Sequence, residues 1–93
     1  MASWRVELTP AAVRRLRRVR ADELLALHGV ILALADDRRP PGARKLRGTD
    51  LWRIRLRIDG APWRVVYEVR ARERLVVVTR VARRDEATYR RLD

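Results

Sequence analysis

Strict alternation of apolar and charged residues over Leu51–Ile58 constrains the fold more than any other feature of the sequence. Tryptophan, isoleucine and leucine occupy positions 52, 54, 56 and 58, and arginine occupies positions 53, 55 and 57. Because successive side chains of a β-strand point to opposite faces of a sheet, the segment predicts a strand with one apolar and one charged face. The apolar face has to be covered, so the chain needs a sheet with a helical layer on one side.

Three more strands are expected around this segment. Trp4–Leu8 also alternates, and Trp63–Val69 and Leu75–Val81 are rich in the β-branched residues that favour strands. Turns at 59–62 and 70–74 separate the last three strands, which therefore form an antiparallel meander.

Two helices are expected between the first strand and the meander, and a third at the end of the chain. Thr9 and Pro10 read as an N-cap residue followed by proline at the first helical position. A second helix is expected over about Asp22–Leu34, with a broad apolar face. That face contains Leu24, Leu25, Leu27, Ile31, Leu32 and Leu34. Residues 36–42, with two prolines and a glycine, form a loop, and Asp85 can cap a short last helix.

The order β-α-α-β-β-β-α predicts one small α+β domain over residues 1–93. We expect an antiparallel sheet of about four strands, with an N-terminal helical hairpin packed on one face and a short C-terminal helix.

The lengths of the turns predict how the last three strands pair. The first turn gives the pairs Ile58–Trp63, Arg57–Arg64, Arg55–Val66 and Arg53–Glu68, the last of which would be an ion pair. The second turn is expected to place Val69 opposite Leu75, which brings Arg80 level with Arg64.

This pairing assigns the residues of the meander to two faces. The face expected to meet the helices contains Trp52, Ile54, Leu56, Ile58, Trp63, Val65, Tyr67, Val69, Val77 and Val81. The opposite face contains Arg53, Arg55, Arg57, Arg64 and Arg80, with Glu68 as its only acid. These five arginines are expected to be exposed, and the three tryptophans and Tyr67 are expected to pack in the core.

The net charge of +11 is concentrated in the second half of the chain. Residues 38–93 hold 17 basic and 7 acidic residues, whereas residues 1–37 hold 6 and 5. Such a field attracts a polyanion: nucleic acid, an acidic protein or an anionic lipid surface. Planar guanidinium groups match phosphate oxygens two bonds at a time, although an arginine-rich coding bias could also supply such charges.

Several kinds of chemistry are excluded by what the sequence lacks. Without cysteine there is no disulfide, zinc finger or thiol nucleophile, and His28 is the only histidine. We therefore expect neither a metal nor a cofactor. No apolar run approaches the roughly 20 residues that span a bilayer, and we expect a cytoplasmic protein.

A set of short motifs in the second half resembles the RelE branch of the RelE/ParE superfamily of bacterial toxin–antitoxin toxins. These motifs are Lys45-Leu46-Arg47-Gly48, the basic strand Leu51–Arg57, Trp63-Arg64-Val65-Val66-Tyr67, Val81-Ala82-Arg83-Arg84, and Tyr89 near the C-terminus. The resemblance implies an mRNA interferase that enters the ribosomal A site. There the 2′-hydroxyl of the message attacks the adjacent phosphate, which leaves a 2′,3′-cyclic phosphate and a free 5′-hydroxyl.

The resemblance also implies roles for particular residues. Arg64 and Arg84 are expected to hold the scissile phosphate, Arg53 and Arg55 to position the message, and Tyr89 to orient the base or share in proton transfer. Contacts to RNA or the ribosome are expected from Lys45, Arg47, Arg57, Arg80 and Arg83. Arginine stays protonated, so the proton acceptor would be Tyr89 or Glu68, unless positioning alone drives the reaction.

Two other functions stay open at this point. A ParE-like toxin would act on DNA gyrase without cleaving anything, and a catalytically weak member would only bind nucleic acid. The expected partners are an acidic, RelB-like antitoxin that folds on binding, and the 70S ribosome with its mRNA. Operator DNA is expected only through the antitoxin, and a membrane is not expected.

Overall fold

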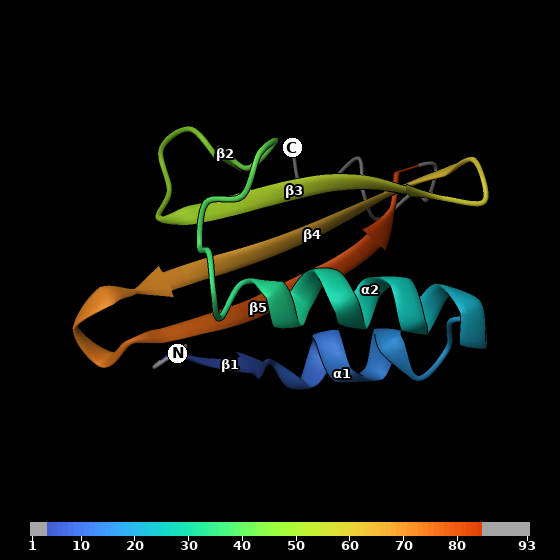
Figure 1. Ribbon diagram of the computed structural model, residues 1–93, viewed down its shortest axis with the longest axis horizontal. Helices are drawn as coiled ribbons and strands as arrows, with labels where there is room; N and C mark the ends of the chain where they lie inside the picture. Colours follow the sequence, from blue (N-terminus) through green and yellow to red (C-terminus); the bar gives the residue numbers. More distant parts are fainter. Residues whose placement is uncertain (1–3, 85–93) are drawn as a thin grey trace.

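The structure, a computed structural model, describes residues 4–84 and confirms the α+β class (Figure 1). The elements are β1 (Arg5–Leu8), α1 (Pro10–Leu16), α2 (Ala21–Ala33), β2 (Arg44–Lys45), β3 (Leu51–Ile58), β4 (Ala61–Arg70), a 3₁₀ turn (Ala71–Glu73) and β5 (Leu75–Arg83). The expected last helix, with Asp85 and Tyr89, lies outside the described residues. No helix of residues 4–84 is long and apolar enough to cross a membrane.

Five strands form one sheet in the order β1-β5-β4-β3-β2. The meander β3-β4-β5 is antiparallel, as expected. Two features differ from the expectation: the two-residue strand β2 adds a fifth strand, and β1 pairs with β5 in parallel. Both helices lie on the same face of this sheet (Figure 1). We call the opposite face the outer face.

The register of β3 against β4 differs from the expected one by two residues. Asp59 and Gly60 both have a positive φ, 50° and 80°, which makes a two-residue turn that pairs Ile58 with Ala61. Arg55 therefore faces Arg64, and Arg53 faces Val66 instead of Glu68. Because side chains alternate with a period of two, this shift leaves every residue of β3 and β4 on its predicted face.

A β-bulge changes the faces of β5. Val66 pairs with Arg80 but the next residue, Tyr67, pairs with Val78, so Thr79 is an extra residue in β5. The β4–β5 turn pairs Val69 with Val76 and not, as predicted, with Leu75, so the residues before the bulge point the other way from the prediction. Arg80 keeps its predicted face but lies beside Val66 and not beside Arg64. Val76 and Val78 are buried in the core, and Val77 lies beside Glu68 on the outer face. After the bulge, Val81 returns to the core as expected.

The helices cover the apolar face with fewer residues than the sequence suggested. Thr9 caps α1 as predicted, since its hydroxyl accepts a hydrogen bond from the Ala12 amide. In α2 the buried apolar residues are Leu27 and Ile31, and together with Leu34, the buried C-cap residue, they follow the spacing of one helix face. The prediction of a broader face was wrong for three residues: Leu24, Leu25 and Leu32 are exposed.

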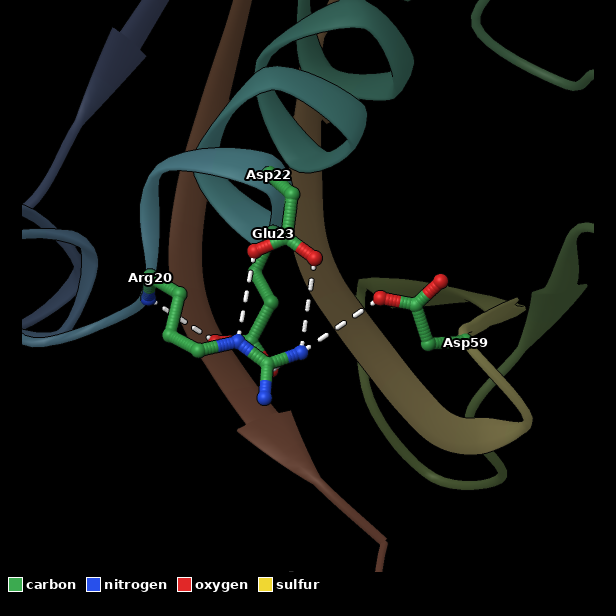
Figure 2. A network of polar contacts seen from close by, with 4 residues as sticks. All are labelled: Arg20, Asp22, Glu23 and Asp59. Atoms are coloured by element: carbon green, nitrogen blue, oxygen red, sulfur yellow. Dashed lines mark hydrogen bonds and ion pairs between the residues drawn. The ribbon is translucent and has the colours of Figure 1, made fainter.

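A polar network fixes the start of α2 against the β3–β4 turn (Figure 2). The Arg20 amide donates to Glu23 Oε1 at 2.9 Å, which caps the helix with a nearly buried carboxylate. The Arg20 guanidinium donates to Asp22 at 3.2 Å and to Asp59 at 3.4 Å. A hydrogen bond between the side chains of Asp22 and Asp59 raises the pKa of Asp59 and lowers the pKa of Asp22.

Trp63 is buried in the core as predicted, Trp4 and Trp52 are only partly buried against it, and each of the three rings lies beneath an arginine. The guanidinium of Arg38 lies 4.3 Å from the ring centre of Trp4, and Arg39 lies 5.1 Å from Trp52. Arg15 of α1 covers Trp63 at 5.1 Å in the same way.

Tyr67 is also structural. Its hydroxyl donates to the Arg38 carbonyl at 2.7 Å, so the loop that follows α2 is fastened to the central strand. Burial, together with the nearby charge of Asp37, raises the pKa of Tyr67 to about 12.

Candidate nucleic-acid interface

Three rows of residues on the outer face collect the predicted site arginines. The first row crosses four strands, with Arg44, Arg53, Val66 and Arg80 side by side. The second row contains Arg55, Arg64 and Ala82. In the third row Arg57 lies beside Pro62, whose carbonyl accepts a hydrogen bond from the Arg84 amide at 2.9 Å. The arginines predicted to share one face do share it.

The charge of the outer face is separated along the strands. At one end Glu68 forms an ion pair with Arg70 at 2.6 Å, and Glu7, a second acid of this face, lies 3.7 Å from Arg5. The predicted ion pair between Arg53 and Glu68 was therefore wrong. At the other end, no carboxylate of residues 4–84 forms an ion pair with Arg44, Arg55, Arg57, Arg80 or Arg84. We call this end of the outer face the basic end, and it is the candidate binding surface.

A cavity of about 370 Å³ opens at the basic end. Four predicted site residues line it: Arg55, Arg57, Arg64 and Arg84. The remaining lining comes from Leu56, Pro62 and Trp63. Guanidinium groups that converge on one cavity can hold the oxygens of a phosphate and stabilise the charge that develops when the phosphate is attacked.

Arg64 differs from its neighbours in burial. It lies in the central strand β4 and only 3% of it is exposed, whereas Arg55, Arg57 and Arg84 are exposed. The prediction of an exposed Arg64 was therefore wrong. A buried guanidinium has little freedom to move, so Arg64 presents a fixed positive charge to the cavity that it lines.

Other predicted residues lie near this cavity or away from it. Arg53 and Arg80 are half-buried in the adjacent row, next to the cavity. Lys45 pairs with Trp52 and Arg83 with Trp63, so both belong to the helical side of the sheet. Arg47 and Lys45 line a separate cavity of about 370 Å³ in the β2–β3 turn. Tyr89 lies outside the described residues.

One arginine at the basic end of the outer face was not predicted from the sequence. Arg44 lies beside Arg53 because β2 pairs with β3. A strand of two residues is too short to show an alternation of apolar and charged residues, so no pattern in the sequence indicates it. Its position could be found only from the pairing itself.

Proton carriers are few in the described part of the site. Glu68, at the far end of the face, is held by Arg70, and this contact raises the pKa of the Arg70 guanidinium. His28 lies exposed on α2, on the other side of the sheet. Within residues 4–84 no group of histidine, cysteine or carboxylate residues could hold a metal ion.

Comparison with known families agrees with this fold. The family model described as the ParE toxin of the type II toxin–antitoxin system, parDE, matches residues 6–88. The chain belongs to the RelE/ParE toxin superfamily. It is thus the toxin of a toxin–antitoxin system. A search of curated proteins by sequence gave no significant match.

Solved structures similar to this superfamily member are RelE toxins. The toxin of the Escherichia coli RelBE complex superimposes with a TM-score of 0.75 at 24% identity, over 90% of this chain and 100% of that one. The isolated E. coli RelE toxin gives 0.74 at 23% identity, over 97% and 95%. The archaeal RelE–RelB complex from Pyrococcus horikoshii gives 0.71 at 24% identity, over 94% and 100%. These similarities establish the RelE fold.

Proposed function

We propose that this toxin is an endoribonuclease that cleaves translated mRNA in the ribosomal A site and so inhibits translation and growth. The observation that supports the proposal is the cavity in which Arg55, Arg64 and Arg84 meet on the basic end of the outer face. A binding surface for the nucleic-acid backbone needs only scattered positive charge. Arginines gathered around one cavity fit the stabilisation of a single phosphate under attack.

In the proposed reaction the 2′-oxygen of the message forms a bond to the adjacent phosphorus, and the bond from phosphorus to the 5′-oxygen breaks. The 2′-hydroxyl gives up its proton and the departing 5′-oxygen gains one. Arg64 and Arg84 hold the phosphate oxygens, and Arg53 and Arg55 position the backbone. The products are a 2′,3′-cyclic phosphate and a 5′-hydroxyl.

The proton acceptor is proposed to be Tyr89. A guanidinium cannot accept a proton at neutral pH, and Glu68 lies at the far end of the face in its ion pair with Arg70. Holding the 2′-oxygen, the phosphorus and the 5′-oxygen in line also contributes to the rate.

A second candidate function is the action of a ParE-like toxin on DNA gyrase without cleavage. It is favoured by the family model that matches the chain, which is that of the ParE toxin. The arginine cavity favours cleavage, because a protein that only blocks gyrase has no need for a phosphate site of this kind.

The partner that we propose for the resting toxin is an acidic, RelB-like antitoxin. Solved complexes of similar fold pair RelE with RelB. The basic end of the outer face offers such a protein complementary charge. The proposed target is the translating ribosome, so we place the action of the toxin in the cytoplasm.

Expression of the toxin in bacteria, followed by primer-extension mapping of message ends, tests the function. We expect growth arrest with cuts inside translated codons, and 5′-hydroxyl ends at those cuts. Arg84→Ala should abolish the cuts, whereas Arg72→Ala, an exposed arginine of the β4–β5 connection, should leave them unchanged. Growth arrest with intact messages and trapped gyrase–DNA complexes would replace cleavage with the ParE-like function.

A further inference from the structure

A second basic cavity, outside the proposed active site, lies between α1 and the end of β5. Its volume is about 470 Å³. The lining residues are Ala11, Arg14, Arg15, Arg17, Arg18 and the segment 79–82 of β5. We call it the α1–β5 cleft. Five arginines meet there, because Arg80 belongs to the β5 segment.

The parallel pairing of β1 explains why this cleft exists. β1 accompanies β5 only along Leu75–Val78. At that point the Thr9 amide donates to the Val78 carbonyl at 3.0 Å, and the Thr9 hydroxyl donates to the Thr79 carbonyl at 3.2 Å. The chain then turns into α1, which runs beside the rest of β5 in place of a strand. Arginines from the first 20 residues consequently lie next to Arg80.

Most of the positive charge in the cleft is not used by the fold. Arg15 covers Trp63 and so has a structural role. Arg14, Arg17 and Arg18 are exposed, and none of them forms an ion pair with a carboxylate in the described part of the chain. A cation in the last turn of a helix interacts favourably with the helix dipole, which explains Arg14. Arg17 is the C-cap residue and Arg18 follows the helix, so both also lie near the negative end of the dipole. At exposed positions this interaction is weak, and it does not occupy the hydrogen-bond donors of the guanidinium groups.

The cleft is continuous with the outer face through one residue. Arg80 lines the cleft and also belongs to the row that contains Arg53 and Arg44. Positive charge therefore extends from β2, across the sheet and around its β5 side, to α1. A single extended polyanion could contact both regions at once.

We propose that the α1–β5 cleft is a second binding site for the phosphate backbone of RNA. Arg17 and Arg18 lie three and four positions after Arg14, and all three line the same cleft together with Arg80. Guanidinium groups so placed bind phosphates without reading bases, so the site is independent of sequence.

An acidic protein fits the cleft less well than RNA. Protein interfaces depend on large apolar or aromatic anchors, and the apolar side chains of the cleft are only two alanines and a valine, Ala11, Ala82 and Val81. The exposed leucines of the described chain lie instead on α2. Binding of RNA backbone follows from the cleft alone, and only the identity of that RNA as ribosomal RNA or message rests on the proposed function.

The test measures the affinity of the purified toxin for a fluorescent single-stranded RNA over a range of salt concentrations. Arg14→Gln/Arg18→Gln removes two charges from the cleft. Arg5→Gln/Arg72→Gln removes two charges near the start of β5, roughly 15–20 Å along the strand, and is the matched control. Circular dichroism melts establish that both variants are folded, and Arg14→Lys/Arg18→Lys keeps the charge of the cleft.

We expect the cleft variant to bind about tenfold more weakly, with a salt slope smaller by about 1.4, since each phosphate contact to a single strand contributes about 0.7. The lysine variant should keep the slope, and the control should change affinity less than about threefold. Equal losses in the cleft variant and the control, or unchanged RNA affinity with weaker binding to polyglutamate, would overturn the proposal. Toxin that binds RNA through the cleft yet leaves cellular messages intact would refute the proposed cleavage alone.

Discussion

Burial distinguishes arginines that the sequence makes equivalent. Arg55 and Arg64 lie side by side in one row, yet Arg55 is exposed and Arg64 is 3% exposed. Alternation predicts which face a strand residue takes but not how deeply that face is covered, because coverage depends on chain segments far away. Mutagenesis of the site therefore has to separate loss of chemistry from loss of folding.

At Arg64 both losses are expected together. Replacing it with alanine removes a buried guanidinium and leaves a void in the central strand, which should lower the free energy of unfolding by about 1–3 kcal/mol. Arg55→Ala, at an exposed position, should change it by less than about 0.5 kcal/mol. Urea denaturation of the two variants measures the difference, and equal values would contradict the buried position of Arg64.

Among the elements, four of the five strands of the described sheet were predictable, and β2 and the exact pairings were not. The alternation of β3 determines its two faces, and an error of two residues in register leaves them unchanged. Neither the register of the β4–β5 turn nor the bulge at Thr79 has a signature in a run of valines. The register error of one residue at that turn assigned Val77 to the core in place of Val76 and Val78. The site arginines of β3 and β4 were therefore found from sequence, whereas Arg44 and the α1–β5 cleft needed the pairings.

Helix α2 shows the same limit, because its sequence holds more leucines than one buried face can use. Leu27 is fully buried and Leu25 is 75% exposed, although they are two residues apart. Leu27→Ala should cost about 2–5 kcal/mol of unfolding free energy, and Leu25→Ala less than about 0.5 kcal/mol. Thermal and urea unfolding provide the measurement, and a large cost at Leu25 would show that its face is covered in solution.

The described part of the molecule consists of a helical layer and a sheet, and the longer of the two connections between them is the loop after α2. That loop, after α2, is held where the Tyr67 hydroxyl donates to the Arg38 carbonyl and where arginines lie over Trp4 and Trp52. The basic surface spans both layers, since the cleft takes its arginines from α1 and β5. Counting the charge separately for residues 1–37 and 38–93 did not reveal this arrangement, because the cleft combines arginines from both parts of the sequence.

Ionisation of Tyr67 at high pH should break its hydrogen bond to the Arg38 carbonyl and so weaken the contact between the loop after α2 and the sheet. Its pKa is raised to about 12 in the folded protein, so the fold favours the protonated form. The stability linked to this proton is complete below about pH 10 and is lost as the pH rises toward 12. NMR of ¹³C-labelled tyrosine, assigned with Tyr67→Phe, should show the late titration. Tyr67→Phe should also lose stability less steeply over this pH range than the parent protein.

The parallel pairing of β1 with β5 has a consequence for synthesis of the protein. Residues 5–8 pair only with residues 75–78, so β1 cannot join the sheet until this part of β5 has been synthesised. Contacts between such distant parts of a chain form slowly and late in folding. The α1–β5 cleft cannot form without this contact, and without it the sheet would end at β5 instead of β1. A nascent chain therefore cannot complete this part of the fold before β5 has been synthesised, and a toxin of this fold acquires its full RNA-binding surface only after that point.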